Sequence, residues 1–156
     1  MFPKRFRLQA SWFFNKTLKE GMRYYACPFF VIMALPHWHE TGRLKALEDP
    51  QYRPRIGFVT SKKVHKRAVK RNRLKRIVRE WMRQSLWQDD CYDWKGVASV
   101  AVVFRPDAVK VAEADVLERM RHAFTPKQFK RLAEWSPTPL EQVEQVEQVK
   151  GASDAS

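Results

Sequence analysis

Apolar and polar positions repeat along this chain with two different periods, and each period predicts its own elements. Runs rich in β-branched and aromatic residues at 23–26 and 29–35 predict two strands around Pro28. The run RIGFVT at 55–60 predicts a third strand. VASVAVVF at 97–104 is the most hydrophobic run, so we expect a strand in the middle of a sheet.

Helical spacing occupies the segments between these strands. Phe14 and Leu18 share a side at i,i+4 in a short helix that Ser11 could cap and Gly21 could end. Two further amphipathic helices are expected after residue 112, the second starting at Pro126. Their inward positions are Val116, Leu117, Met120, Ala123, Phe124, Phe129, Leu132 and Ala133.

The segment 61–83 is crowded with lysine and arginine, and Glu80 is its only acid. Wound as a helix, its second half has an apolar side made of Leu74, Ile77, Val78 and Trp81. The opposite side carries Asn72, Arg76, Arg79 and Arg83, and the borders carry Arg71, Arg73 and Lys75. Solvated helix faces usually mix charges in i,i+4 pairs, and only Arg76 with Glu80 could form one here. This pattern favours a helix anchored by one side that offers the other to a polyanion.

These elements predict one domain over residues 1–136, of α/β (α+β) class. We expect a two-layer sandwich in which helices pack on a small mixed sheet of about four strands. The polar, proline-bounded stretch 37–54 is interpreted as a long loop, with at most a turn of helix at 44–48. We expect it to be a disordered bulge rather than a functional insertion. Residues 137–156 repeat Glu-Gln-Val and are predicted to be a flexible, low-complexity acidic tail.

Composition points to the same kind of partner. The 156 residues carry a formal net charge of +13, and most of the basic excess lies in the first 90 residues. Nucleic acid is the first candidate and an anionic membrane surface the second, and the abundance of arginine favours nucleic acid. No apolar run approaches membrane-spanning length, and the two cysteines are far apart, so we expect a reduced, cytoplasmic protein.

Residues suited to catalysis are sparse. His37 and His39 could supply two metal ligands, but no acidic or thiol pair follows at a ligand spacing. Asp89, Asp90 and Asp93 lie in a turn-like setting that favours capping and solvation. There is no glycine-rich phosphate loop. We therefore predict no catalytic residue and no metal ligand in the protein itself.

One motif is specific enough to suggest a family. Ser61-Lys62-Lys63 follows a strand containing Gly57, and after a spacer comes Arg71-Asn72-Arg73, then Lys75-Arg76 and Arg79-Glu80. This pattern, R-x-G-x-x-x-SKK and then RNR-x-KR-x-x-RE, resembles the protein subunits of bacterial ribonuclease P. The resemblance covers about residues 5–134. The chain departs from it in the basic spacer Lys66-Arg67 and in the longer stretch 37–54.

The resemblance implies a small α/β sandwich with a left-handed crossover between two parallel strands. It also implies that a large RNA holds the Mg²⁺ ions and cleaves precursor tRNA, releasing the 5′ leader. The protein would bind ribonuclease P RNA and grip the leader of precursor tRNA in a cleft between the basic helix and the sheet. A structural RNA-binding protein, such as a ribosomal protein, is the alternative, and a protein-only nuclease is a third hypothesis.

The resemblance also implies roles for individual residues. The residues expected to bind RNA are Arg71, Asn72, Arg73, Arg76, Arg79, Lys62 and Lys63, with Lys75 where RNA and leader meet. We add Lys66 and Arg67 of the basic spacer to this RNA-binding set on their charge, since the family pattern does not include them. The leader cleft would be lined by Phe14, Leu18, Phe30 and Ile32. Both faces of the strand that contains Phe30 are apolar, so either both are covered or one is a binding surface.

Overall fold

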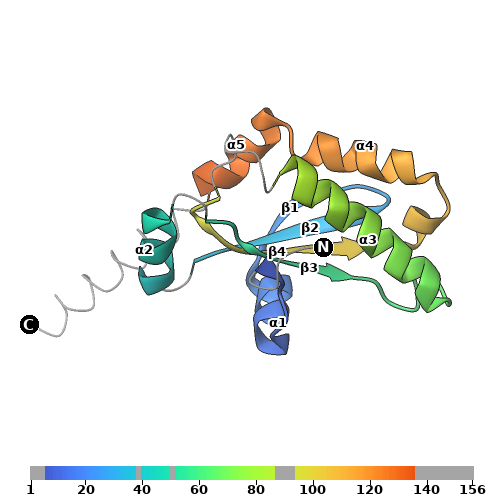
Figure 1. The fold of residues 1–156 in the computed structure, drawn as a ribbon, viewed down its shortest axis with the longest axis horizontal. Coiled ribbons are helices and arrows are strands. Elements are labelled where there is room, and N and C mark those ends of the chain that lie inside the picture. The colour runs from blue at the N-terminus through green and yellow to red at the C-terminus, as the bar shows by residue number, and fades with distance from the viewer. Residues whose placement is uncertain (1–5, 38–39, 50–51, 87–93, 136–156) are drawn as a thin grey trace, which may run out of the picture.

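A computed structural model of the chain describes residues 6–37, 40–49, 52–86 and 94–135. Its centre is one sheet with the strand order β1-β2-β4-β3 (Figure 1). The strands are β1 (Met22–Ala26), β2 (Phe30–Pro36), β3 (Arg55–Val59) and β4 (Val97–Phe104). The predicted α/β sandwich on a small mixed sheet is confirmed, and β4 lies in the interior of the sheet as its hydrophobicity predicts.

Helices cover both faces of this sheet. They are α1 (Ser11–Glu20), α2 (Glu40–Glu48), α3 (Ala68–Ser85), the 3₁₀ helix η2 (Pro106–Val109), α4 (Glu113–Ala123) and α5 (Pro126–Trp135). Figure 1 shows α3, α4 and α5 over one face, α1 on the other and α2 at one end of the molecule. The helix α3 is the segment whose two sides the sequence distinguishes.

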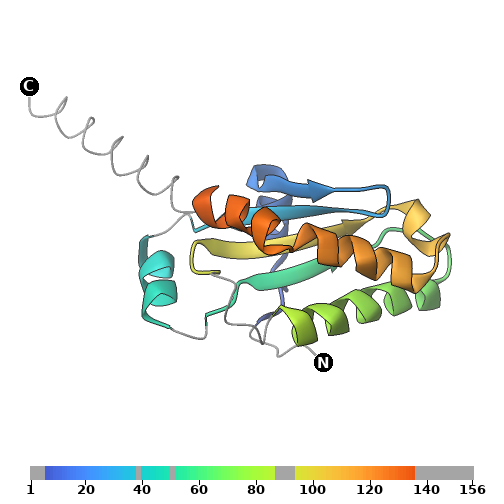
Figure 2. The same ribbon diagram turned by 90° about the horizontal axis from the view of Figure 1, so that it is seen from above.

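The chain reaches β4 from β3 through α3. β3 and β4 are parallel neighbours, whereas β1 with β2 and β2 with β4 are antiparallel. In Figure 2, α3 lies on the viewer's side of the sheet, and the path from β3 through α3 to β4 is left-handed. This is the less common hand for a parallel crossover. It places α3 along the β3 edge of the sheet instead of over its centre (Figure 2).

The face of the sheet under α3, α4 and α5 is the hydrophobic core. Phe30 and Ile32 belong to it and are fully buried, together with Val78 and Met120 from the covering helices and Phe124 at the end of α4. The prediction that Phe30 and Ile32 line the leader cleft is therefore wrong. Strand alternation identifies two apolar faces, but it does not say which face three helices will cover.

The other face carries α1, which packs on β2 and β4. Its buried Thr17 hydroxyl donates to the carbonyl of Phe13 at 2.9 Å and lies 2.6 Å from the Ser99 hydroxyl, which must then be the donor to it. Gly21 ends the helix as predicted, since a Cβ there would collide with the Thr17 carbonyl oxygen. Ser11 is not the cap, because it is already the first helical residue.

The stretch 37–54 is not the predicted disordered bulge, because it contains α2. The Tyr52 hydroxyl donates to the carbonyl of Val97 at 2.6 Å and accepts from His37 Nε2 at 3.0 Å. Burial raises the pKa of Tyr52 well above its usual range, so this donor stays protonated. Ala46 is fully buried on the inner side of α2. A short, partly buried polar network thus attaches the insertion to the start of β4.

The reassignment of Ile32 can be tested by stability. Ile32→Ala removes a fully buried side chain, so we expect it to lower the free energy of unfolding by about 2–5 kcal/mol. Met33→Ala is the matched control, because this neighbour lies on the other face of the same strand and is only partly buried. Urea unfolding followed by circular dichroism measures both. A loss at Ile32 smaller than the loss at Met33 would show that the faces of β2 are reversed.

Candidate nucleic-acid interface

One side of α3 anchors the helix. Leu74, Val78 and Met82 are buried at a spacing of four residues and join the core. Trp81 is only partly buried, with its ring 6.4 Å from that of Phe124. The predicted apolar side is therefore correct for Leu74 and Val78, partly so for Ile77 and Trp81, and it omitted Met82. The predicted apolar side was centred about 50° around the helix from the observed line of contact, at 100° per residue.

The opposite side of α3 is basic and open to solvent. Asn72, Arg73 and Arg76 are exposed, and Arg71 is partly buried. Glu80 pairs with Arg83 at 3.0 Å, not with Arg76, and this hydrogen bond lowers the pKa of Glu80. Because both members of that pair are partly exposed, it contributes little to stability. The pair of Glu80 with Arg83 neutralises the C-terminal end of the basic side and leaves the end that carries Arg71-Asn72-Arg73 charged.

Arg73 also connects two helices. Its Nε lies 2.5 Å from Oε1 of Glu113, in the first turn of α4. A carboxylate at a helix N-terminus is favourable in itself, so Glu113 interacts with the α4 dipole as well as with Arg73. The terminal nitrogens of a guanidinium bound through Nε can still contact a phosphate. This ion pair therefore holds the Arg73 side chain towards the N-terminus of α4.

The segment before α3 adds further positive charge. Lys62, Lys63, Lys66 and Arg67 are all exposed. Buried Val64 anchors their turn, and its amide donates to the Ser61 carbonyl at 3.0 Å. The four predicted basic residues thus lie on solvent-facing backbone that leads directly into the RNR motif.

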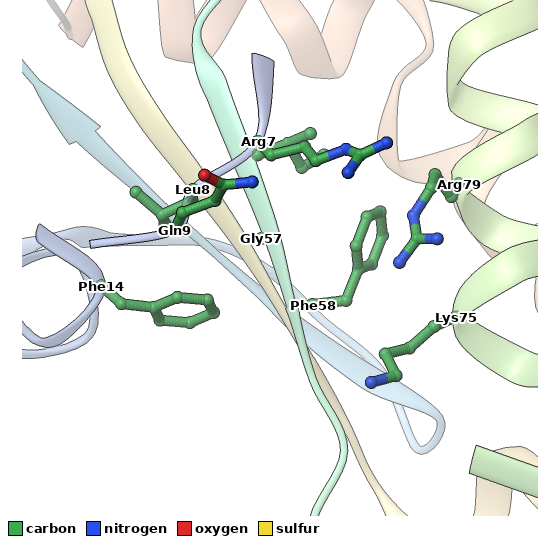
Figure 3. Close-up of a pocket in the computed structure, with 9 residues that line it drawn as sticks. Arg7, Leu8, Gln9, Phe14, Gly57, Phe58, Lys75 and Arg79 are labelled. Atoms are coloured by element: carbon green, nitrogen blue, oxygen red, sulfur yellow. The ribbon is translucent and has the colours of Figure 1, made fainter. Parts of the chain in front are cut away.

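A cleft of about 240 Å³ lies where α3, the edge of β3 and the N-terminal segment meet (Figure 3). Its lining combines cationic, amide and aromatic groups. These residues are Arg7, Leu8, Gln9, Phe14, Ile56, Gly57, Phe58, Lys75 and Arg79. A site with cations beside aromatic rings is suited to a nucleotide, since phosphates and bases need those two kinds of contact.

The N-terminal segment forms one wall by pairing with β3. Arg7 and Ile56 form a parallel bridge, and the Leu8 amide donates to the Ile56 carbonyl at 2.9 Å. Peptide groups of alternate residues in a strand point to the same edge. The N–H and C=O of Phe58 therefore face the same side as those of Ile56, which is the side of the cleft.

Phe14 closes the cleft from the α1 side. A Cβ on Gly57 would lie 2.5 Å from Cε2 and 2.8 Å from Cζ of Phe14, so the ring lies directly on the glycine. Glycine at position 57 of β3 thus creates the space that Phe14 occupies. The sequence motif contains this glycine, and the structure gives a reason for it.

Arg79 forms the wall on the α3 side. Its guanidinium lies over the Phe58 ring, 5.5 Å from the centroid (Figure 3). Phe58 in turn stacks on Phe104, with ring centroids 6.2 Å apart. Burial, and then repulsion by Arg7, lowers the pKa of Arg79. Two arginines close enough to repel each other across a cleft form a favourable position for a phosphate.

The predicted cleft residues are thus divided by the structure. Phe14, Lys75 and Arg79 line the cleft, Leu18 is partly buried outside its lining, and Phe30 and Ile32 lie in the core. Sequence reasoning missed Arg7, Gln9 and Phe58. The available signal was the position of Phe58 beside Gly57 in the third strand. Nothing in the sequence pattern placed residues 7–9 against that strand.

The remaining candidates for chemistry lie elsewhere or outside the described residues. His37 is hydrogen-bonded to Tyr52 through Nε2. His39, Asp89, Asp90 and Asp93 lie outside the described residues. Among the residues that are described, no group of three or more His, Cys, Asp or Glu could hold a metal ion. Within the same ranges, no helix has the length and apolar character to span a bilayer.

Comparison with known sequences identifies a family. The family model described as Ribonuclease P matches residues 2–128. The chain is 30% identical over 118 residues to the ribonuclease P protein component of Parasynechococcus marenigrum, covering 74% of this chain and 88% of the relative. It is 37% identical over 91 residues to that of Pseudomonas syringae pv. tomato, covering 58% of this chain and 60% of the relative.

Solved structures agree on the fold. The ribonuclease P protein of Staphylococcus aureus superposes with a TM-score of 0.57 at 22% identity, covering 76% of this chain and 91% of that one. The protein from Thermotoga maritima gives a TM-score of 0.55 at 23% identity, covering 74% and 92%. These likenesses show that the chain shares its fold with these proteins.

The contact between Phe14 and Gly57 predicts a measurable coupling. Gly57→Ala should lower the free energy of unfolding by about 1–3 kcal/mol, because its methyl group overlaps the Phe14 ring. The same substitution in a Phe14→Ala background should cost less, since only the contact with Leu8 Cβ at 3.1 Å then remains. A double-mutant cycle by thermal or urea unfolding measures the difference, which we expect to be about 0.5–3 kcal/mol. Additive losses would mean that the ring does not lie on the glycine.

Proposed function

This chain belongs to the ribonuclease P protein family, and from that premise we propose that its cleft holds the 5′ leader of precursor tRNA while the outer side of α3 contacts ribonuclease P RNA. As the protein component of that holoenzyme, a tRNA-processing endoribonuclease, it associates with ribonuclease P RNA. Family membership decides against the alternative of a ribosomal protein. The proposal concerns which surfaces carry which RNA.

The observation that carries the proposal is that α3 presents polar and basic side chains on two surfaces, one facing solvent and one lining the cleft. Arg76 and Asn72 face solvent, whereas Lys75 and Arg79 of the same helix line the cleft. One rigid element can therefore neutralise phosphates of two polyanions and bring them together. Lys75 adjoins both surfaces, as expected for a residue where catalytic RNA and leader meet.

The cleft suits a single strand of variable sequence. The Phe14 ring and the Arg79 guanidinium held over Phe58 offer flat surfaces that accept any base, and Arg7 and Lys75 offer cations for the backbone. In this proposal the chain binds and orients the leader, and no bond is broken by its side chains. The Mg²⁺ ions that support hydrolysis are held mainly by the RNA, and the protein acts in the cytoplasm.

A reconstitution assay tests the proposal. Precursor tRNA is incubated with the purified chain, with a bacterial ribonuclease P RNA, and with both, at low Mg²⁺ concentration. We expect no cleavage by the chain alone, slow cleavage by the RNA and faster cleavage by the pair, with a mature 5′ end. Cleavage by the chain alone would establish a protein nuclease, and an unstimulated RNA would contradict the proposed role.

Salt dependence tests the assignment of α3. Arg76→Ala should weaken binding to ribonuclease P RNA and reduce the slope of log K against log salt by about one, because one phosphate contact is lost. Arg79→Ala should weaken binding to precursor tRNA more than to mature tRNA. Arg121→Ala is the control, since this arginine is exposed on α4. Filter binding across a salt series gives the slopes, and equal slopes for Arg76→Ala and Arg121→Ala would count against the assignment.

A further inference from the structure

Trp12 is an exposed aromatic residue that the cleft does not use. Of the large apolar side chains that the structure describes, Trp12, Leu44, Leu47 and Val69 are largely exposed, and only Trp12 is aromatic. Its side chain is 63% exposed. A single exposed aliphatic residue is ordinary, but an indole presents a wide flat surface to water.

The indole has a rigid support. Trp12 stacks on Phe13, with ring centroids 5.3 Å apart and planes inclined at 29°. Phe13 is partly buried, and its carbonyl accepts from the buried Thr17 hydroxyl, which also bonds to the Ser99 hydroxyl of β4 and so fastens α1 to the sheet. The two rings thus form an aromatic platform, Trp12 with Phe13, on a helix whose position is set by the core.

The platform has a basic setting on α1. At 100° per residue, Lys16 and Lys19 lie within about 40° of Trp12 around the helix. Lys16 pairs with Glu20 at 2.7 Å, and Lys19 is exposed. Phe14 lies about 160° away around the same helix, on the side that closes the cleft. The helix α1 therefore carries aromatic rings on two sides, one in the cleft and one in solvent.

We propose that the Trp12–Phe13 platform is a second stacking site for an unpaired nucleobase of the leader, beyond the nucleotides held in the cleft. The inference rests on the proposed function. Three features favour RNA as the occupant: the net charge of +13, the lysines beside the platform and the continuity of α1 with the cleft. Stacking on an indole requires no particular base, so the site would add affinity without sequence preference.

Leader length is the variable that isolates this site. Holoenzyme reconstituted with a bacterial ribonuclease P RNA is titrated with precursor tRNAs whose leaders are shortened one nucleotide at a time. For long leaders, Trp12→Ala should weaken binding about fivefold to a hundredfold, the range for losing one stacked base. For the shortest leaders and for mature tRNA, it should have no effect. Trp12→Phe should retain part of the affinity.

Controls separate this inference from the proposed function. Leu47→Ala removes another exposed apolar side chain and should change nothing. Phe14→Ala should weaken binding of short and long leaders alike. If Phe14→Ala acts in this way and Trp12→Ala has no effect, the platform is refuted and the leader cleft stands. If the wild-type holoenzyme does not distinguish precursor from mature tRNA, the proposed function itself fails.

Two other outcomes would also overturn the platform. If Trp12→Ala lowers the affinity for every RNA equally, including mature tRNA, then Trp12 contacts ribonuclease P RNA or supports the fold. Thermal unfolding of Trp12→Ala distinguishes these two cases. Binding to anionic phospholipid vesicles that is lost in Trp12→Ala, without a change in leader affinity, would assign the platform to a membrane surface. The fluorescence of Trp12 is the difference between the emission of the wild type and that of Trp12→Phe. If long leaders quench this difference, the result directly supports stacking on Trp12.

Discussion

The contact between one side of α3 and the sheet is the interaction on which the site depends. Leu74, Val78 and Met82 fix the rotation of the helix about its axis. A rotation by one residue would bring Lys75 and Arg79 towards the core, and an unpaired buried charge costs several kcal/mol. Apolar packing therefore determines where every cation of this helix points. The binding surface follows from the core.

The cleft is made by chain segments that are far apart in sequence. Residues 7–14, the strand β3 and the middle of α3 meet there because β3 is an edge strand. Its inner edge pairs with β4, and among the described residues its outer edge is paired at the bridge of Arg7 to Ile56. Edge strands offer peptide groups to a further partner. Here the N-terminal segment takes part of that edge, and the cleft lies along the rest.

The sequence predicted what local periodicity and motif can specify. The positions of the strands, α3, α4 and α5 follow from apolar spacing, and the RNR motif identified the family. The lining of the cleft was predicted less well from the sequence. Phe30 and Ile32 lie on an apolar face of β2, and such a face has the same sequence pattern whether or not helices cover it. Residues 7–9 were missed because their contact with β3 is tertiary. The helix α2 was predicted as no more than a turn at 44–48, because no apolar stripe marks it and its stretch is attached to the fold by the hydrogen bonds of Tyr52 to His37 and Val97 outside the helix.

The central claim is that one helix serves two RNAs, with the leader on its β3 side. Photocrosslinking tests it directly: precursor tRNA carrying a single photoreactive nucleotide in the leader is bound to the reconstituted holoenzyme, and the attached peptides are identified by mass spectrometry. The account predicts crosslinks to residues 7–14, to Phe58 and to Lys75 or Arg79. Crosslinks confined to α2 or to the outer surface of α4 would contradict it.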